Sequence, residues 1–392
     1  MKKILYISYD GLLEPLGQSQ VLEYQKKLSK KHDIFIISFE KISLDINNEF
    51  HNSVLNTVKT FNINWYRLQY HKKPTGLATS FDILIGILYA SFLILKYKIE
   101  IIHARSYVPS VIAIVMKKLL GVKFIFDMRG FWADERVDGG IWKRNSLLYK
   151  IAKWFESKFI LNTDHIVSLT KSGINEIKKF EYIDRNMPPY SVISTCTNLD
   201  MFTYQPNKNQ NFTLGYVGSV GTWYDFDSVT VAFKELLKII PDATFLIVNQ
   251  HEHEYILKKL HKNNLSKDRY ELVSANHSEV PLLMNQMDAG IFFINQFFSK
   301  TASAPTKLGE FLGCGIPCLT NNKIGDMQSI IELENVGVSI PDFSQESIQI
   351  GIQDIIDITQ TPNISNQCVH ASKKYFSLNS GVKRYDEIYS SL

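Results

Sequence analysis

Short apolar runs alternate with longer helical patterns along almost the whole 392-residue chain. In the first half, runs rich in Ile, Val and Phe occupy residues 4–9, 34–39, 100–104, 123–127 and 165–170. The second half repeats the pattern at residues 212–217, 244–249, 270–274, 290–294 and 316–320. Strand–helix alternation of this kind is typical of parallel sheets with helices on both faces. The sequence therefore predicts an α/β fold.

The length of the chain favours two domains, because a single hydrophobic core rarely grows to this size. Between the two series of predicted strands lies a polar, Pro-interrupted stretch, residues 182–211. We predict one domain over residues 1–195 and a second domain over 205–375. A last helix, over 376–392, is expected to pack back on the N-terminal domain. Two such domains that face each other would form a substrate cleft.

The net charge of +4 hides an asymmetry between the two halves. Residues 1–190 hold 28 Lys and Arg against 18 Asp and Glu (+10), and the remainder holds 15 against 21 (−6). A basic first half favours contact with an anionic surface or acceptor, although an uneven, solvated surface gives the same count. We expect peripheral contact with an anionic inner membrane and no nucleic-acid partner.

Cysteine usage and the apolar segments indicate a cytoplasmic protein. The cysteines form no CxxC pair and no zinc-like spacing, so they are expected to be reduced thiols. The N-terminus turns polar after seven residues, which predicts a first strand and not a signal peptide. The uncharged run Ile83 to Leu95 has 13 residues, too few to span a bilayer. We expect a helix buried between the sheet and its neighbours, with a membrane-surface helix as the alternative.

The strongest local motif runs from Ser303 to Pro317. Ser303 is a typical N-cap and Pro305 suits a first turn, so a helix is predicted to begin here and to end at Gly313 and Gly315. Lys307 and Glu310 are three residues apart and therefore share one helix face. A lysine in a first turn opposes the helix dipole, unless a phosphate binds there. The lysine would then meet phosphate and the glutamate a ribose; the alternative is a solvated ion pair.

A glycine-rich turn, GYVGSVG at residues 215–221, follows a predicted strand and precedes a helical pattern. Glycine allows close approach to a phosphate, and the helix N-terminus supplies oriented N–H donors. The alternative is a simple tight turn.

Polar residues also follow three strands of the first half. Residues 10–20 form an expected long loop after the first strand, Arg105 follows the run 100–104, and Arg129 follows 123–127. A guanidinium binds diphosphate in a forked geometry. Asp127 is expected to pair with an arginine more than to act in catalysis, and His103 is expected in the core.

Five segments together resemble the retaining glycosyltransferases of family 4, in particular bacterial members that build surface polysaccharides. They are YISYDGLLEPLGQSQV (6–21), HARSYVPS (103–110), FDMRGFWADERVDGG (126–140), GYVGSVG (215–221) and KLGEFLGCGIPC (307–318). The resemblance extends over nearly the whole chain. It implies the GT-B fold, in which two Rossmann-like domains face each other. The domain over 1–195 would be the acceptor-side domain, and the domain over 205–375 would bind the nucleotide sugar.

The resemblance also assigns roles. Glu310 matches the glutamate that binds the ribose, Gly218 and its neighbours match the diphosphate loop, Gly17 matches the glycine of the first loop, and Arg129 stands near a histidine that touches the transferred sugar. The donor-binding candidates are Gly17, Gly218, Ser219, Gly221, Thr306, Lys307 and Glu310; the catalytic candidates are Arg129 and Lys307; Arg105 and Asp127 are candidate sugar or phosphate contacts.

Three positions depart from the family pattern. Ala302 replaces an earlier glutamate, and Ser219 and Tyr224 stand about where an arginine and a lysine usually follow the glycine loop. We expect Lys307, Arg129 and Arg105 to supply the missing positive charge.

The resemblance implies a metal-independent hexosyltransferase without a cofactor. Its donor would be a UDP-sugar, or else a GDP-sugar, and its acceptor a glycan or lipid-linked molecule in polysaccharide synthesis. Fixed cations can stabilise the departing diphosphate, and no DxD-like carboxylate pair is visible. A nucleotide-sugar epimerase and a non-catalytic nucleotide-sugar-binding partner are the alternatives.

Overall fold

The structure is a computed structural model that describes residues 1–41, 49–183, 187–206 and 211–392. It divides into two compact units, each described here by itself. Unit 1 comprises Met1–Ser194 and Leu378–Leu392, and unit 2 comprises Thr195–Ser377. The C-terminal unit therefore begins at Thr195, ahead of the expected residue 205, and the last helix is grouped with unit 1.

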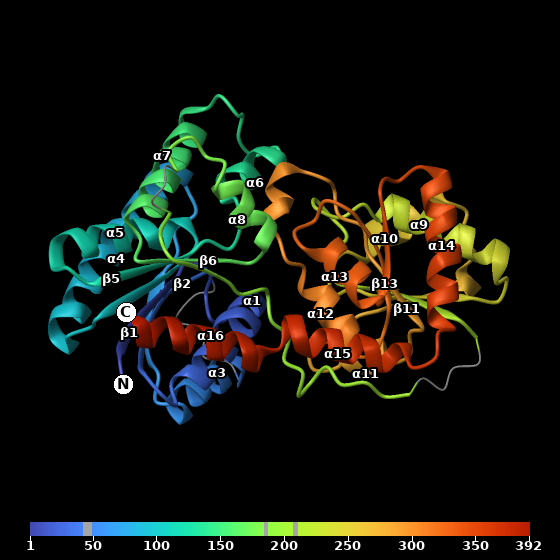
Figure 1. The fold of residues 1–392 in the computed structure, drawn as a ribbon, viewed down its shortest axis with the longest axis horizontal. Helices are drawn as coiled ribbons and strands as arrows, with labels where there is room; N and C mark the ends of the chain where they lie inside the picture. Colours follow the sequence, from blue (N-terminus) through green and yellow to red (C-terminus); the bar gives the residue numbers. More distant parts are fainter. Residues whose placement is uncertain (42–48, 184–186, 207–210) are drawn as a thin grey trace. The chain divides into compact units, whose positions relative to one another are not determined.

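Unit 1 is built on a seven-stranded parallel sheet of order β3-β2-β1-β4-β5-β6-β7. The strands are β1 (Lys3–Ser8), β2 (Asp33–Glu40), β3 (Asn64–Gln69), β4 (Ile101–Arg105), β5 (Lys123–Asp127), β6 (His165–Ser168) and β7 (Tyr190–Val192). The helices include α1 (Pro15–Gly17), α2 (Glu23–Leu28), α3 (Glu49–Thr60), α4 (Thr75–Tyr97), α5 (Tyr107–Leu120), α6 (Trp132–Asp138), α7 (Leu147–Asn162), α8 (Lys171–Ile177) and α16 (Leu378–Ser391), with a π-helical turn over Gln18–Leu22. Helices α4, α5 and α7 cover one face of the sheet, and α3 and α16 lie on the other (Figure 1).

Unit 2 has a six-stranded parallel sheet of order β10-β9-β8-β11-β12-β13. Its strands are β8 (Thr213–Val217), β9 (Thr244–Val248), β10 (Tyr270–Val273), β11 (Ala289–Ile291), β12 (Cys318–Asn321) and β13 (Gly337–Ile340). Its helices include α9 (Phe226–Ile239), α10 (His253–Lys262), α11 (Val280–Met284), α12 (Thr306–Gly313), α13 (Met327–Glu334), α14 (Gln345–Thr359) and α15 (Ile364–Phe376), with 3₁₀ turns over Lys267–Arg269 and Phe298–Ala302.

The predicted α/β architecture is confirmed, and every predicted strand overlaps an observed one. The prediction missed β3, β7 and β13. All three are edge strands, β3 and β7 in one sheet and β13 in the other. An edge strand is covered less completely than a central one, so NWYRLQ, YSV and GVSI carry no continuous apolar run.

Two local predictions were wrong. The run Ile83–Leu95 is part of the 23-residue helix α4, and that helix buries only one of its faces. Ser303 does not cap α12: the N-cap residue is Pro305, and no side chain caps this end. Residues 10–20 are also less of a loop than expected, because the chain is helical from Pro15 onward.

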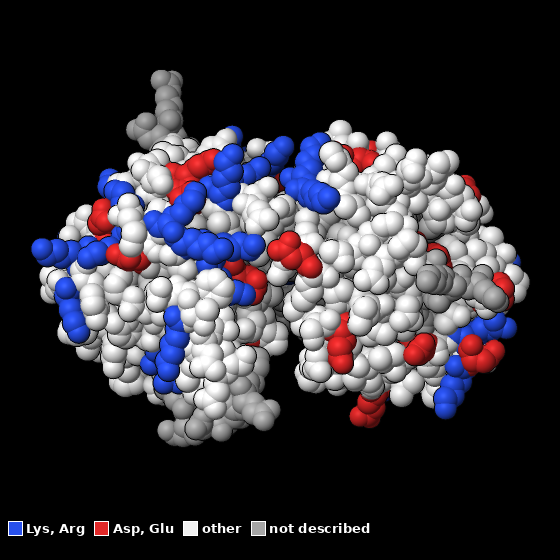
Figure 2. Space-filling model, turned by 90° about the horizontal axis from the view of Figure 1, so that it is seen from below, with Lys and Arg blue, Asp and Glu red and all other residues white. Residues whose placement is uncertain are grey.

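The charge asymmetry of the sequence is visible on the surface. In Figure 2, which keeps unit 1 on the left as in Figure 1, Lys and Arg side chains gather on unit 1.

Two tyrosines of α16, Tyr385 and Tyr389, are buried in unit 1. Tyr385 bonds to Asp127 at the carboxyl end of β5, and Tyr389 bonds to His103 of β4.

Candidate functional site

In unit 2, Lys307 of α12 lies beneath the glycine-rich turn that follows β8. Gly218 begins this turn with a φ of 94°, in the region that favours glycine. A Cβ atom on Gly218 would stand only 3.1 Å from the Lys307 Cε. The Lys307 ammonium donates to the Ser219 carbonyl oxygen at 3.3 Å and lies 3.6 Å from the centre of the Tyr224 ring. The fold thus joins two motifs that are 88 residues apart.

The Lys307 ammonium is buried with only neutral oxygens and aromatic rings against it. Besides Ser219, it donates to the Tyr216 hydroxyl at 3.4 Å. In the described part of the chain no carboxylate oxygen lies within 4 Å of it. Burial lowers the pKa of Lys307 to about 7, although Glu310 and Glu252 oppose the shift. A buried cation without a counter-charge is a favourable place for an incoming anion.

Glu310 lies one helical turn beyond Lys307 and is half-buried. Burial raises its pKa to about 7, against the opposing effect of Lys307. The two side chains form no ion pair in the described structure, so the alternative of a solvated pair is wrong. Thr306, the first residue of α12, directly precedes Lys307 and is also half-buried.

Glu252, which was not predicted as a site residue, contacts the backbone of the glycine turn. Its carboxylate accepts from the Val220 amide and from the Asn249 side chain, both at 3.0 Å. It also stands 3.1 Å from where a Cβ of Gly221 would lie. One amide that a phosphate was expected to use is therefore already paired with a carboxylate.

Lys300 is the second residue that sequence reasoning missed. Its ammonium lies 3.7 Å from the centre of the Trp223 ring, two residues after the glycine turn, and the side chain is buried. Lys300 belongs to a short 3₁₀ turn, which has no hydrophobic periodicity to mark it. One sequence feature could have drawn attention to Lys300: Ala302, two residues further on, stands where the family pattern has a glutamate.

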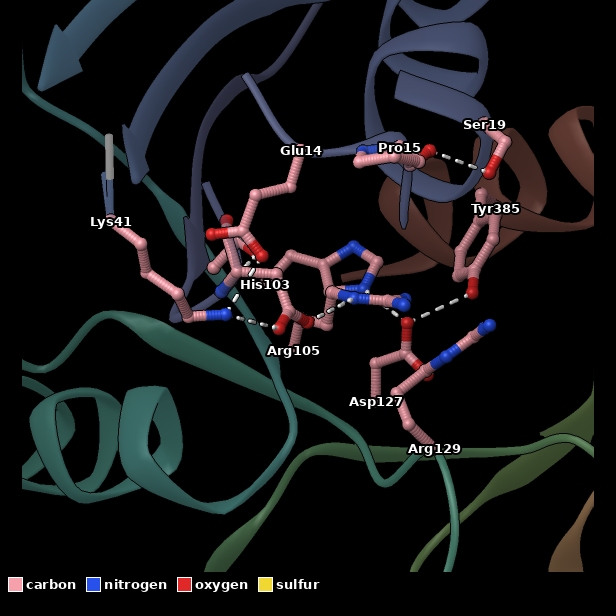
Figure 3. A network of polar contacts seen from close by, with 11 residues as sticks. Glu14, Pro15, Ser19, Lys41, His103, Arg105, Asp127, Arg129 and Tyr385 are labelled. Atoms are coloured by element: carbon pink, nitrogen blue, oxygen red, sulfur yellow. Dashed lines mark hydrogen bonds and ion pairs between the residues drawn. The ribbon is translucent and has the colours of Figure 1, made fainter. Parts of the chain in front are cut away.

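In unit 1, the carboxyl ends of β4 and β5 carry a buried polar network (Figure 3). Asp127 accepts from the Tyr385 hydroxyl at 3.1 Å and contacts His103 at 3.3 Å, and its other oxygen lies 3.9 Å from Arg129. His103 is buried and also bonds to Tyr389 at 2.6 Å. Burial would raise the pKa of Asp127, but Arg129 and His103 bring it below its usual value.

The two candidate arginines, Arg105 and Arg129, are held in unusual states. Arg105 is buried, with its Nε 3.6 Å from Asp10, and its Nε and Nη1 have no hydrogen-bond partner. Arg129 has a φ of 57°, a left-handed conformation that a non-glycine residue adopts at a cost. Unpaired buried donors and backbone strain are both features of ligand sites.

Gly17 has a structural reason to be glycine. A Cβ atom there would stand 1.9 Å from the carbonyl oxygen of Gly11, so any side chain would push the first turn apart. That turn is held from the other side by Glu40, which accepts from the amides of Leu12 at 2.9 Å and Leu13 at 3.2 Å.

The site candidates thus form two sets, one in each unit. Unit 2 holds Gly218, Ser219, Gly221, Thr306, Lys307 and Glu310, and unit 1 holds Gly17, Arg105, Asp127 and Arg129.

Residues 200–374 match the model of the family "Glycosyl transferases group 1". Sequence search finds no match among curated proteins. Among solved structures, the chain is similar to a sucrose-phosphate synthase from Thermosynechococcus elongatus, at 12% identity and a TM-score of 0.73, with 100% of this chain and 99% of that one covered. It is similar to Anabaena HepE in complex with UDP and glucose, at 13% identity and a TM-score of 0.70, with both chains fully covered. It is also similar to WaaG, a glycosyltransferase involved in lipopolysaccharide biosynthesis, at 15% identity and a TM-score of 0.67, with 98% and 99% covered.

Identities this low establish the fold alone, and the family match concerns the C-terminal unit. The chain is thus a protein of the two-domain GT-B fold, and its residues 200–374 match the group 1 glycosyl transferases.

Proposed function

We propose that this protein transfers a sugar, with retention of configuration, from a nucleotide diphosphate-sugar. A UDP-sugar is the first choice of donor and a GDP-sugar the second. The match to the group 1 glycosyl transferases supports sugar transfer, and the similarity to HepE, solved with UDP and glucose, supports the uridine nucleotide. The acceptor would be a glycan or a lipid-linked molecule in cell-surface polysaccharide synthesis. The similarity to WaaG, involved in lipopolysaccharide biosynthesis, supports that role.

The position of Lys307 carries the proposal. Cleavage of the sugar–phosphate bond leaves positive character on the anomeric carbon and negative charge on the diphosphate. A diphosphate at the glycine turn would contact the buried Lys307 ammonium. It would provide the negative counter-charge that no carboxylate of the described residues provides. It would also raise the pKa of Lys307, so the lysine would become fully charged as the leaving group forms. Glu310, one turn along α12, would accept the ribose hydroxyls.

In unit 1, Arg105 and Arg129 would contact the transferred sugar or a phosphate of the acceptor. The unpaired N–H groups of Arg105 can donate to a sugar or phosphate oxygen in the forked geometry of a guanidinium. Asp127, through its pairing with Arg129, would position that arginine. Because protein cations stabilise the leaving group in this scheme, we propose that no metal ion is needed.

A cytoplasmic location, on the inner face of the membrane, completes the proposal. The four cysteines are buried thiols, which supports a reducing compartment.

A second candidate is a non-catalytic partner that binds nucleotide sugar. Ser219 and Tyr224 stand where the family pattern has two cations, and Glu252 brings a negative charge to the glycine turn. Both features weaken the stabilisation of a departing diphosphate.

A thermal-shift screen of nucleoside diphosphates and their sugars tests donor binding, since a ligand of the folded state raises the melting temperature. The best donor is then incubated with lipid extracts as acceptor, with and without EDTA. Labelled sugar in the lipid fraction, unaffected by EDTA, is the expected result. Binding without transfer favours the non-catalytic partner, and conversion of the free nucleotide sugar without acceptor favours the epimerase. The absence of any nucleotide effect contradicts the proposal as a whole.

A further inference from the structure

Helix α4 presents a continuous apolar stripe to solvent. Six large apolar side chains recur at intervals of three or four residues, and each is 51–74% exposed: Leu77, Phe81, Leu84, Leu88, Phe92 and Leu95. The opposite side of the helix is buried against unit 1 through Ala78, Asp82, Gly86, Ala90 and Leu93. An exposed stripe of this length is unusual in a soluble protein and marks an interaction surface.

The helix is fixed to unit 1 by a buried carboxylate. Asp82 accepts from the Tyr9 hydroxyl at 2.7 Å and from the His71 amide at 3.1 Å, and it pairs with the His71 ring at 2.6 Å. By length and composition alone, Gly76–Tyr97 could cross a membrane. Insertion across a bilayer would break these contacts and move a carboxylate into hydrocarbon, which is costly. The stripe is therefore suited to lie on a surface and not to span one.

Within residues 71–98, the segment that carries the stripe, the exposed charges have one sign; the nearby Glu100 is exposed and pairs with Lys2. Between residues 71 and 98, Asp82 is the only acidic residue and it is buried, whereas Lys72, Lys73, Lys96 and Lys98 are exposed at the two ends of the helix.

Helix α7 repeats the arrangement. Its exposed apolar side chains are Leu147, Leu148, Ile151, Trp154 and Leu161. Glu156, the only acidic residue between 141 and 163, is buried and bonded to Tyr107 and Lys153, whereas Lys150 is exposed. Helix α5 packs against both α4 and α7, so the two stripes belong to one layer of helices (Figure 1).

We propose that the exposed stripes of α4 and α7 insert into the interface of an anionic lipid bilayer, with the flanking lysines against the headgroups. Apolar side chains between cations are the pattern of helices that lie in a membrane interface. A second copy of the chain fits less well, because a symmetric contact between two α4 stripes would bring the lysine-bearing ends together. The inference deepens the proposed function. It rests on that function in one respect: an acceptor at the membrane is the reason for the protein to bind the bilayer.

The experiment is vesicle flotation of the full chain, with phosphatidylcholine vesicles and with vesicles that also contain phosphatidylglycerol. The test variant is Leu84→Gln/Leu88→Gln. Its matched control, Leu333→Gln/Ile350→Gln, changes side chains of similar exposure, 73% and 55%, on helices of unit 2. We expect anionic vesicles to bind the wild type and the control equally, and the test variant at least about tenfold more weakly. Lys72→Gln/Lys73→Gln should weaken binding and reduce its sensitivity to salt.

Equal flotation of all variants, or no flotation of the wild type, would overturn the inference. A dimer in solution that the Leu84→Gln/Leu88→Gln change abolishes would assign the stripe to a second copy instead. The thermal shift with UDP is measured on the same samples. Loss of that shift with intact flotation would count against the proposed function alone, and a normal shift without flotation against the bilayer alone.

Discussion

Replacement of Lys307 by methionine should weaken nucleotide binding and at the same time stabilise the unliganded protein. Methionine keeps the apolar stem that lies beneath Gly218 and removes the charge. Within the described residues the ammonium is buried without a carboxylate partner, and burial lowers its pKa to about 7. Its removal therefore relieves a desolvation cost, whereas the diphosphate loses its proposed cation.

The two effects have different sizes and can be measured apart. A hydrogen bond to a charged group contributes about 1.5–3 kcal/mol, so UDP affinity should fall by about 10- to 150-fold. A fall in the pKa of a lysine from 10.5 to about 7 corresponds to at most about 5 kcal/mol of lost stability. The methionine also gives up the contacts with the rings of Tyr216 and Tyr224, worth up to about 2 kcal/mol. We expect a net gain of about 1–3 kcal/mol in the free energy of unfolding.

The stability gain should depend on pH in a defined direction. Between about pH 7 and 10.5 the unfolded chain binds a proton at Lys307 and the folded chain does not, so wild-type stability rises with pH. The advantage of the variant should therefore be largest near and below pH 7 and should shrink as the pH approaches 10.5.

Urea unfolding at several pH values measures the stability, and isothermal titration calorimetry measures the affinity for UDP and for uridine. Lys259→Met is the control. It removes a lysine of the same unit that pairs with Asp227 near the surface, so stability should change by no more than about 1 kcal/mol and UDP affinity not at all. Unchanged UDP affinity in Lys307→Met, with a folded protein, would refute the assignment of this lysine to the diphosphate.

Four further predictions concern the same two sites. Glu310→Gln should weaken UDP and uridine alike, by about tenfold or more, because the ribose loses a charged acceptor; a loss confined to UDP in calorimetry would contradict this role. UDP affinity of the wild type should fall as the pH rises above about 7, where free Lys307 is neutral, and calorimetry in buffers of different ionisation enthalpy should detect proton uptake on binding. Glu252→Gln keeps an oxygen for its amide partner and removes a negative charge near Lys307, so UDP should bind about fivefold more tightly, and weaker binding would show that the carboxylate is needed. Asp127→Asn should lower the free energy of unfolding, measured in urea, by about 3–5 kcal/mol, because Arg129 stays buried without its counter-charge. The pKa of Asp127 is lowered in the folded protein, so the greater stability of the wild type should persist above about pH 4. It should disappear as the pH falls through the folded-state pKa.

The order of the elements was predictable from the sequence alone. Central strands of parallel sheets are buried on both faces, so each is written as a continuous apolar run, and the turns beyond them are marked by glycine or by a charged residue. The same local rules identified the glycine turn at Gly218 and the shared helix face of Lys307 and Glu310. They did not extend to the edge strands β3, β7 and β13, whose residues are covered on fewer sides, or to the true N-cap of α12 at Pro305.

The state of the site was decided by the tertiary structure. Lys307 is a buried cation only because Tyr216 and Tyr224, more than 80 residues away, cover its ammonium. Tyr385 reaches Asp127 across 258 residues of sequence. Helix α4 has apolar side chains on more than one of its sides, and its contacts with unit 1, not its composition, determine which side remains exposed. Periodicity records which way a side chain points from its own helix or strand, whereas burial, pKa and the partners of a charge depend on what the rest of the chain places opposite it.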